Sequence, residues 1–427
     1  MKRSLRECAV LLLSAGMTIS TIVQIRPFSF NLTYADMLYL LGALLWLFHL
    51  ARSPRALVQF IQQNRAYMLC ALLLMLGASA SLVNAYRPVD ALLSMAQYGF
   101  VFGVLTPLFS MVFQNAQEKR RLLICFAASG HIAAGLAAAD FIGLMPFQIP
   151  GIALRSGRYM STLNNANAFA LVMAMGLPVS LAFVAAPGRR AVRWYFAFGT
   201  ALNAYGLALS ASLGGFLGGA FGLGAFAVLI VSAQKGRARR RTVLALAASV
   251  AVIAGGAVYG FSAAERLPIP TRFLERVAAL GSIQEAENYG TRAELTAHGF
   301  KTLSKHFIVG VGQEQHKEIT PTGHSVHVNY LLVFVENGLI GFVGYIGMIV
   351  ALLLKAFRLV RASPPEERPL AIGLTASFLA LLAILCVHTN VHMRYAWAPA
   401  FVIAAYGGVL RRGGDEDHSM LVSGRRS

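Results

Sequence analysis

The chain has 427 residues, of which 57% are apolar and 13% are charged, and its formal net charge is +19 at pH 7. A soluble domain averages about 45–50% apolar and about 25% charged residues, so this composition excludes an ordinary soluble globular protein and a disordered one. The basic excess would suit nucleic-acid binding, but membrane proteins also collect Lys and Arg in their cytoplasmic loops.

Long apolar stretches recur along the whole chain. A stretch of about 17–25 apolar residues is long enough to cross a bilayer core of about 30 Å as a helix. The first stretch follows a basic start, Met1–Arg6, and eleven more come after it, so we interpret it as a retained signal anchor. We therefore expect an all-α polytopic membrane protein with about 12 transmembrane helices and one large helical periplasmic loop. The expected spans lie near residues 8–24, 35–51, 66–83, 91–113, 122–145, 164–186, 192–210, 213–233, 242–262, 327–354, 370–389 and 395–410.

The distribution of Lys and Arg over the connecting segments predicts the orientation. With the N-terminus inside, the inner segments hold 25 Lys and Arg residues and the outer segments hold 12. This asymmetry predicts that both termini are cytoplasmic, and it explains the basic composition without nucleic acid. The expected organisation is transmembrane helices over residues 1–262, a periplasmic loop over 263–326, three more transmembrane helices over 327–410, and a disordered cytoplasmic tail over 411–427.

Two of the outer segments are not short turns. The first spans about 146–163, and the second, about 263–326, is the longest hydrophilic stretch of the chain. A connection this long is more often functional than a spacer. Its apolar pattern predicts one helix from about residue 274 that ends at Asn288–Gly290, and a second helix over about 291–305 with Thr291 as its N-cap.

Arginine residues in these outer segments run against the trend that keeps positive charge inside. An anionic ligand such as a phosphate or pyrophosphate group would explain them, because the planar guanidinium binds phosphate oxygens in bidentate fashion. The alternative is that they are solvated residues paired with nearby glutamates. The candidate pyrophosphate-binding residues are Arg155, Arg158, Arg272, Arg276 and Arg292, of which Arg272 and Arg276 would share one face of a helix.

Histidines form the second candidate group. His324 and His327 stand where the tenth span begins, and a helix extending back that far would place both on one side at the membrane boundary. An ionisable group entering an apolar span is a functional candidate, although a structural role in helix capping is the alternative. Neutral His327 could accept a proton from an attacking hydroxyl, and a protonated one could hold a phosphate.

Other polar residues lie near this candidate centre. We expect supporting roles for His298, His324, Asn329 and Glu336, and the last outer turn, with His388, His392 and Arg394, could border the same cavity. We expect no metal site, because no cysteine or paired carboxylate joins the histidines, and no cofactor.

The order of these motifs resembles the O-antigen ligase and polymerase superfamily. The resemblance rests on Arg155-Ser156-Gly157-Arg158, on Thr291-Arg292 leading to Gly310-Val311-Gly312, and on a His followed by two spaced glycines. In the ligase pattern a His is followed by a polar residue and, at a fixed spacing, by two glycines. Counted from His327, the two glycines are Gly338 and Gly341, but Val328 stands where the family has Asn, Ser or Gln. Leu213 stands where family members often carry an Arg.

The resemblance implies a glycosyltransferase that moves O-antigen polysaccharide from undecaprenyl pyrophosphate to a sugar hydroxyl of lipid A-core, at the periplasmic face of the bacterial inner membrane. It implies His327 as the catalytic residue and direct, inverting, metal-independent transfer, with the arginines on the pyrophosphate. The alternatives are an O-antigen polymerase, a protein O-oligosaccharyltransferase and, from a different class, a 12-span transporter or flippase, which would carry ionisable groups near the membrane midplane.

Overall fold

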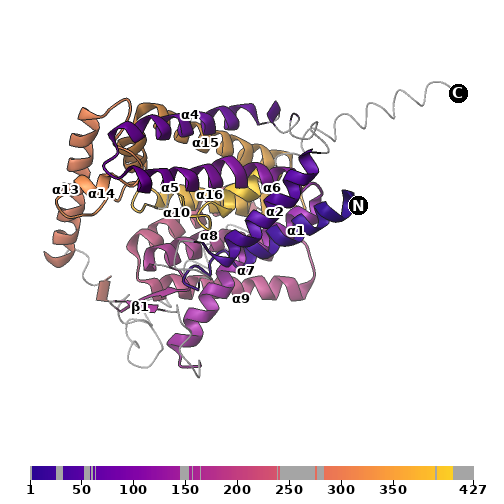
Figure 1. Ribbon diagram of the computed structural model, residues 1–427. Coiled ribbons are helices and arrows are strands. Elements are labelled where there is room, and N and C mark those ends of the chain that lie inside the picture. Colours follow the sequence, from indigo (N-terminus) through magenta and orange to yellow (C-terminus); the bar gives the residue numbers. More distant parts are fainter. Residues whose placement is uncertain are drawn as a thin grey trace.

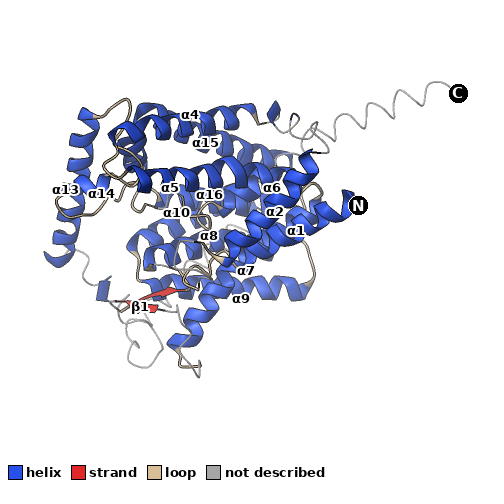
Figure 2. Cartoon of the chain, in the orientation of Figure 1, coloured by secondary structure: helices blue, strands red, loops and turns tan. Residues whose placement is uncertain are grey.

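The described chain is almost entirely helical, with one small β-hairpin (Figure 2). The computed structural model describes residues 2–25, 32–51, 58, 61–62, 64–144, 153–155, 157–163, 165–237, 239–240, 275–276, 283–389 and 392–406. The elements that precede the β-hairpin are α1 (Lys2–Thr18), α2 (Tyr34–Ala51), α4 (Arg65–Ser81), η1 (Leu82–Asn84), α5 (Pro88–Tyr98), η2 (Gly99–Leu105), α6 (Thr106–Val112) and α7 (Ala116–Phe141). The hairpin and the later elements are β1 (Ala153–Arg155), β2 (Arg158–Ser161), α8 (Ala166–Ala185), α9 (Arg190–Ser210), α10 (Leu213–Ser232), α13 (Ile283–Lys305), α14 (His316–Ile319), α15 (Asn329–Ala362), α16 (Arg368–Ile384) and α17 (Ala398–Tyr406).

Seven helical segments of the described part are long and apolar enough to cross a membrane: Tyr34–Ala51, Arg65–Asn84, Pro88–Val112, Ala116–Phe141, Ala166–Ala185, Leu213–Ser232 and Asn329–Ala362. The all-α membrane class is therefore confirmed. Helices overlap eleven of the twelve expected positions, but α1, α9, α16 and α17 do not meet both criteria, and the expected span at 242–262 lies outside the described residues. The tail at 411–427 also lies outside them.

The two ends of the helical bundle can be told apart by their contacts. At one end, which we call the α1 end, Lys355 Nζ donates to Asn64 Oδ1 at 3.0 Å and to the Ala404 carbonyl at 3.2 Å. At the opposite end, which we call the α13 end, lie α13 and α14 (Figure 1). Val23 of the chain after α1 donates its N–H to Thr162, next to the β-hairpin, at 2.9 Å.

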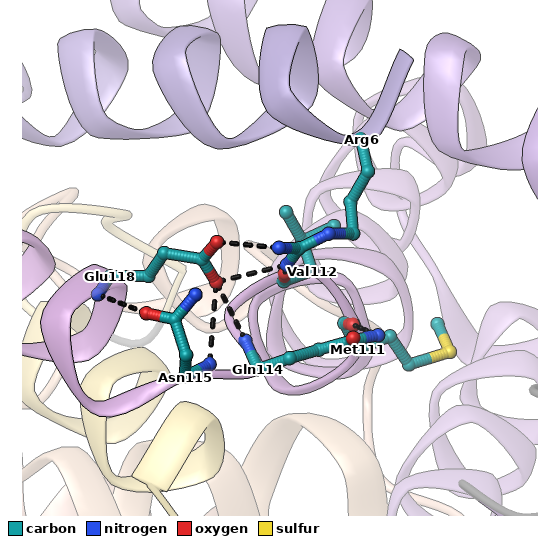
Figure 3. A network of polar contacts seen from close by, with 6 residues as sticks. All are labelled: Arg6, Met111, Val112, Gln114, Asn115 and Glu118. Atoms are coloured by element: carbon teal, nitrogen blue, oxygen red, sulfur yellow. Dashed lines mark hydrogen bonds and ion pairs between the residues drawn. The ribbon is translucent and has the colours of Figure 1, made fainter. Parts of the chain in front are cut away.

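A polar network fixes the start of α7 at the α1 end (Figure 3). Asn115 and Glu118 form a capping box, in which the Asn115 side chain accepts the Glu118 N–H at 2.8 Å. Arg6 of α1 donates to both Glu118 oxygens, at 2.9 and 2.6 Å, and to the Val112 carbonyl at 2.9 Å. The basic start of the chain is thus tied to the loop between α6 and α7.

Close packing of small residues brings α8, α10 and α16 together. A Cβ on Gly218 would meet Ile384, one on Gly222 would meet Ala380, and one on Gly215 would meet Ala170. The short four-residue spacing of these glycines therefore has a packing role. It places the N-terminus of α10 beside the end of α16, at the α13 end of the bundle.

The helix α15 is a hairpin of two arms rather than one straight rod. Gly338 has φ 65° and ψ −173°, a conformation open to glycine alone, and it interrupts the helix after Asn337. Aromatic pairs form across this break, since the rings of Phe334 and Phe342 stack at 4.5 Å and those of Tyr330 and Tyr345 lie 6.3 Å apart. The span expected over 327–354 is therefore present as a candidate membrane helix, but it is interrupted at Gly338. The second arm, residues 339–362, is about 36 Å long at ~1.5 Å per residue, which suffices to cross a bilayer.

The loop before α14, residues 306–315, forms hydrogen bonds with the backbone at this break. Leu339 N–H donates to Phe307 O at 2.8 Å, and Val311 and Gly312 donate to the carbonyls of Val335 and Glu336 at 3.0 Å each. These bonds satisfy backbone groups that the interruption of the helix leaves unpaired. Gly310 and Gly338 thus have a structural role, because a Cβ on either would collide with the backbone of the facing segment.

Two local predictions about the outer segments are wrong. The helix α13 runs without interruption over Ile283–Lys305, so no helix ends at Asn288–Gly290 and Thr291 is not an N-cap. The segment 146–163 contains the antiparallel strands β1 and β2, in which Arg155 stands opposite Arg158. The expected helix from about residue 274 is described only at 275–276.

Candidate functional site

The turn between α9 and α10 is the centre of the candidate site. α9 ends at Ser210, Ala211 follows in the left-handed region with φ 47°, and Ser212 caps α10 by accepting the Gly215 N–H at 3.2 Å. One helix thus presents its last carbonyls and the next presents its first N–H groups within four residues. Such a turn attracts cations on one side and anions on the other.

Two of the predicted arginines bind the carbonyl side of this turn. Arg158 donates through Nε to Ser210 O at 3.0 Å and through a terminal nitrogen to Asn167 Oδ1 at 2.7 Å. Arg276 donates to Ala211 O at 2.8 Å. These contacts are to neutral oxygens, and they orient each guanidinium. The two arginines come from segments more than 100 residues apart and meet beside Leu213, where family members often carry an Arg.

His327 is positioned by the hydrogen bonds of its neighbours in the chain. The Val326 N–H donates to His316 Nδ1 at 3.3 Å, and the Asn329 N–H donates to Leu385 O at 3.0 Å. Because α15 begins at Asn329, neither His324 nor His327 is helical, and the expectation that both share one helix face is not met.

The charges around His327 favour its neutral form. Burial lowers the pKa of His327 below its ordinary value, and the neighbouring Arg292 and His324 lower it further. His324 itself is exposed, and its carbonyl accepts the Thr320 hydroxyl at 2.8 Å. Arg292 of α13 therefore lies close to the imidazole that was predicted to be catalytic.

His388, in the turn after α16, joins these groups in one place. Burial lowers its pKa to about 3, and the neighbouring groups Arg292, His327, Arg158 and Arg276 add to that effect. Four predicted site residues, from β2, the segment at 275–276, α13 and the chain just before α15, thus lie near a single buried imidazole. The sequence alone indicated His388 only as a residue that could border the cavity; its place opposite α10 depends on the packing of α16.

The other predicted residues have different positions. The side chain of Arg155 and all of Arg272 lie outside the described residues. His298 approaches His316, with Nδ1 and Nε2 3.5 Å apart, so it supports the segment before His327 rather than contacting His327 itself. Asn329 donates through Nδ2 to the Tyr345 hydroxyl at 2.9 Å, inside the α15 hairpin. Glu336 is buried beneath the loop, where its Oε1 accepts the His316 N–H at 3.5 Å.

Asn167 is a residue whose role the sequence did not reveal. Among the asparagines that open α8, Asn165 is the N-cap and accepts the Ala168 N–H at 2.7 Å. Asn167 instead binds Arg158 and also accepts the Ser212 hydroxyl at 2.9 Å. It connects the β-hairpin to the cap of α10, a role that only the packing of α8 against α10 creates.

The described part of the chain holds no group of three or more His, Cys, Asp or Glu side chains that could bind a metal ion. The four cysteines, Cys8, Cys70, Cys125 and Cys386, are unpaired with one another. The prediction of metal-independent chemistry stays a prediction.

Comparison with known proteins bears on this geometry. Residues 198–346 match the family model described as O-antigen ligase, and no curated protein matches the chain. The matched segment contains the α9–α10 turn, Arg276, Arg292, His327 and the break at Gly338, and it ends before His388. By its apolar helices the chain is a multi-pass membrane protein, and its segment 198–346 is similar to the O-antigen ligase superfamily of ligase- or polymerase-type glycosyltransferases.

Proposed function

We propose that this protein is an O-antigen ligase, which transfers a polysaccharide from undecaprenyl pyrophosphate to a sugar hydroxyl of lipid A-core. The observation that carries the proposal is that Arg158 and Arg276 both bind the α9–α10 turn, and that these two arginines and Arg292 lie near His388. Guanidinium groups from separate segments, gathered beside a helix N-terminus, suit a doubly charged phosphate ester better than any neutral ligand.

The same groups suit the departure of the donor lipid. In the proposed reaction the acceptor hydroxyl oxygen bonds to the anomeric carbon, and the bond from that carbon to the pyrophosphate oxygen breaks. Negative charge then grows on the leaving pyrophosphate, where fixed positive charges stabilise it. Pyrophosphate is already a good leaving group, so the proposal needs neither nucleotide hydrolysis nor a metal.

His327 is the proposed acceptor of the hydroxyl proton. A general base must be unprotonated at the working pH, and the lowered pKa of His327 keeps its imidazole neutral. Direct displacement without a covalent intermediate inverts the anomeric centre. The role of Arg292 is then twofold, since its charge attracts the donor and also keeps His327 neutral.

The proposed orientation places the α13 end in the periplasm and both termini in the cytoplasm. It follows the distribution of Lys and Arg, with 25 on the proposed inner side and 12 on the outer side. It also puts the cationic site where a flipped polyprenyl-linked glycan and lipid A-core are both present, at the outer face of the bacterial inner membrane.

The deciding experiment is transfer by the purified full-length protein, with an undecaprenyl-linked glycan as donor and three acceptors offered in parallel. Glycosylation of lipid A-core supports the ligase proposal. Extension of a second carrier-linked glycan would instead identify a polymerase, and glycosylation of a pilin acceptor an oligosaccharyltransferase. A protein that moves the lipid-linked glycan between leaflets of a vesicle, with no transfer to any acceptor, would be a flippase.

A further inference from the structure

His388 has a buried nitrogen that no described residue satisfies. The residue is 5% exposed, and its Nε2 atom has no hydrogen-bond partner among the described residues. An unsatisfied buried polar atom costs about 1–3 kcal/mol, so structures rarely retain one without a use for it. An unused nitrogen beside a cluster of positive charge therefore points to a ligand.

The nitrogen faces the start of α10. A Cβ built on Gly214 would stand 2.5 Å from Nε2, so the imidazole lies directly over the first turn of this 20-residue helix. The Ser212 hydroxyl oxygen already accepts a hydrogen bond from the Gly215 N–H. The N–H groups of Leu213 and Gly214 belong to the positive end of the helix, where an anion is stabilised.

Glycine at position 214 makes this approach available. Any side chain there would collide with the imidazole and with Val387, whose Cγ2 would be 2.9 Å from the added carbon. The arginines complete the surroundings, because Arg158 and Arg276 bind the carbonyls of Ser210 and Ala211, just before the same helix begins.

We infer that His388 Nε2 and the first turn of α10 together hold one phosphate group of the donor pyrophosphate, with the imidazole donating a hydrogen bond to a phosphate oxygen. This inference rests on the proposed function, and it adds to it a residue from the last outer turn, beyond the segment that matches the family. His388 is thus a binding residue for the leaving group, distinct from His327, which receives the proton of the acceptor.

The charge state of His388 suits this role. Burial and the surrounding cations keep the imidazole neutral at neutral pH, with a pKa of about 3. With its proton on Nε2, a neutral imidazole donates a hydrogen bond without adding another positive charge to three nearby guanidinium groups. An arginine or lysine at this position would add a positive charge that repels the nearby guanidinium groups when no donor is bound.

The test measures binding of inorganic pyrophosphate to the full-length protein in detergent, by isothermal titration calorimetry, alongside the Michaelis constant for the lipid-linked donor. We expect His388→Ala to weaken pyrophosphate binding and to raise the donor constant by about tenfold, equivalent to ~1.4 kcal/mol. His388→Gln, whose amide can place a donor near the position of Nε2, should stay within about threefold of the wild type. His306→Gln, a change at the α13 end outside the cluster, is the matched control and should leave both values unchanged.

A second measurement needs no substitution. In the wild-type protein with 15N-labelled histidine, pyrophosphate should shift the Nε2 resonance of His388. Wild-type affinity for pyrophosphate in a folded His388→Ala protein, or no shift of that resonance at saturation, overturns the inference. Binding that depends on His388 in a protein that glycosylates no acceptor overturns the proposed function and leaves this inference standing.

Discussion

Asn329 donates a hydrogen bond to the Tyr345 hydroxyl across 2.9 Å, although 16 residues separate the two along α15. In a straight helix this separation is about 24 Å along the axis. The contact therefore requires the sharp reversal at Gly338. Asn329, the first residue of α15, also donates its N–H to the Leu385 carbonyl. His327, two residues before Asn329, owes its place near His388 to this reversal.

Gly338→Ala should destabilise this arrangement. The backbone conformation at Gly338 costs a non-glycine residue about 1–3 kcal/mol, and a Cβ there would collide with the Ile308 carbonyl. We expect a lower midpoint of thermal unfolding in detergent and reduced transfer. Gly290→Ala is the control, because its Cβ meets no atom within 4 Å in helix α13, and it should be neutral or slightly stabilising. Equal midpoints for the two variants would contradict the role of the break.

His327→Ala should abolish glycan transfer while the protein still inserts and folds. Loss of a positioned general base lowers kcat by about 10²–10⁴-fold. The measurement is kcat with saturating donor and acceptor, with His306→Ala as a control from the same end of the bundle. Full wild-type transfer by the His327 variant would remove this residue from the mechanism.

Arg292→Ala should weaken donor binding. A charge-assisted hydrogen bond contributes about 1.5–3 kcal/mol, so the Michaelis constant for the undecaprenyl-linked donor should rise at least tenfold. Lys301→Ala changes an exposed positive charge on the same helix and should have little effect. Unchanged kinetics of Arg292→Ala at limiting donor would contradict a role in pyrophosphate binding.

The pH dependence of kcat should report the protonation of His327. The pKa of His327 lies below its usual 6.5, so the base stays neutral at pH 6.5 and activity is lost only as the pH falls further, through that lowered value. Arg292→Gln removes one cause of the lowering, so the acidic limb should move to higher pH. The profile is measured at saturating donor to separate it from binding. An acidic limb that stays in place would mean that Arg292 does not act on His327.

Transfer should survive a strong chelator. The proposed reaction stabilises the leaving pyrophosphate with arginine side chains, so removing divalent ions leaves that stabilisation in place. The check is the transfer rate of purified protein before and after chelation and dialysis. Loss of activity that added zinc restores would reverse the expectation.

Much of the architecture was accessible from the sequence because it depends on composition and local pattern. Apolar runs of the right length predicted the membrane helices, and the spacing from His327 to Gly338 and Gly341 indicated the family. Local patterns failed where tertiary contacts decide the conformation. The break at Gly338 is stabilised by a loop some 30 residues earlier, and no periodicity in α15 reveals that its two arms pack against each other.

The candidate site divides in the same way. The sequence by itself determined which groups are available, an excess of outer arginines and histidines in a membrane protein, because charge and hydropathy are properties of the residues. Only the tertiary structure decided which of them meet. Arg158, Arg276, Arg292 and His327 gather around His388 because the α15 hairpin and the close packing of α10 on α16 bring distant segments to one helix N-terminus, and such proximity is a property of the packed chain, not of any stretch of it.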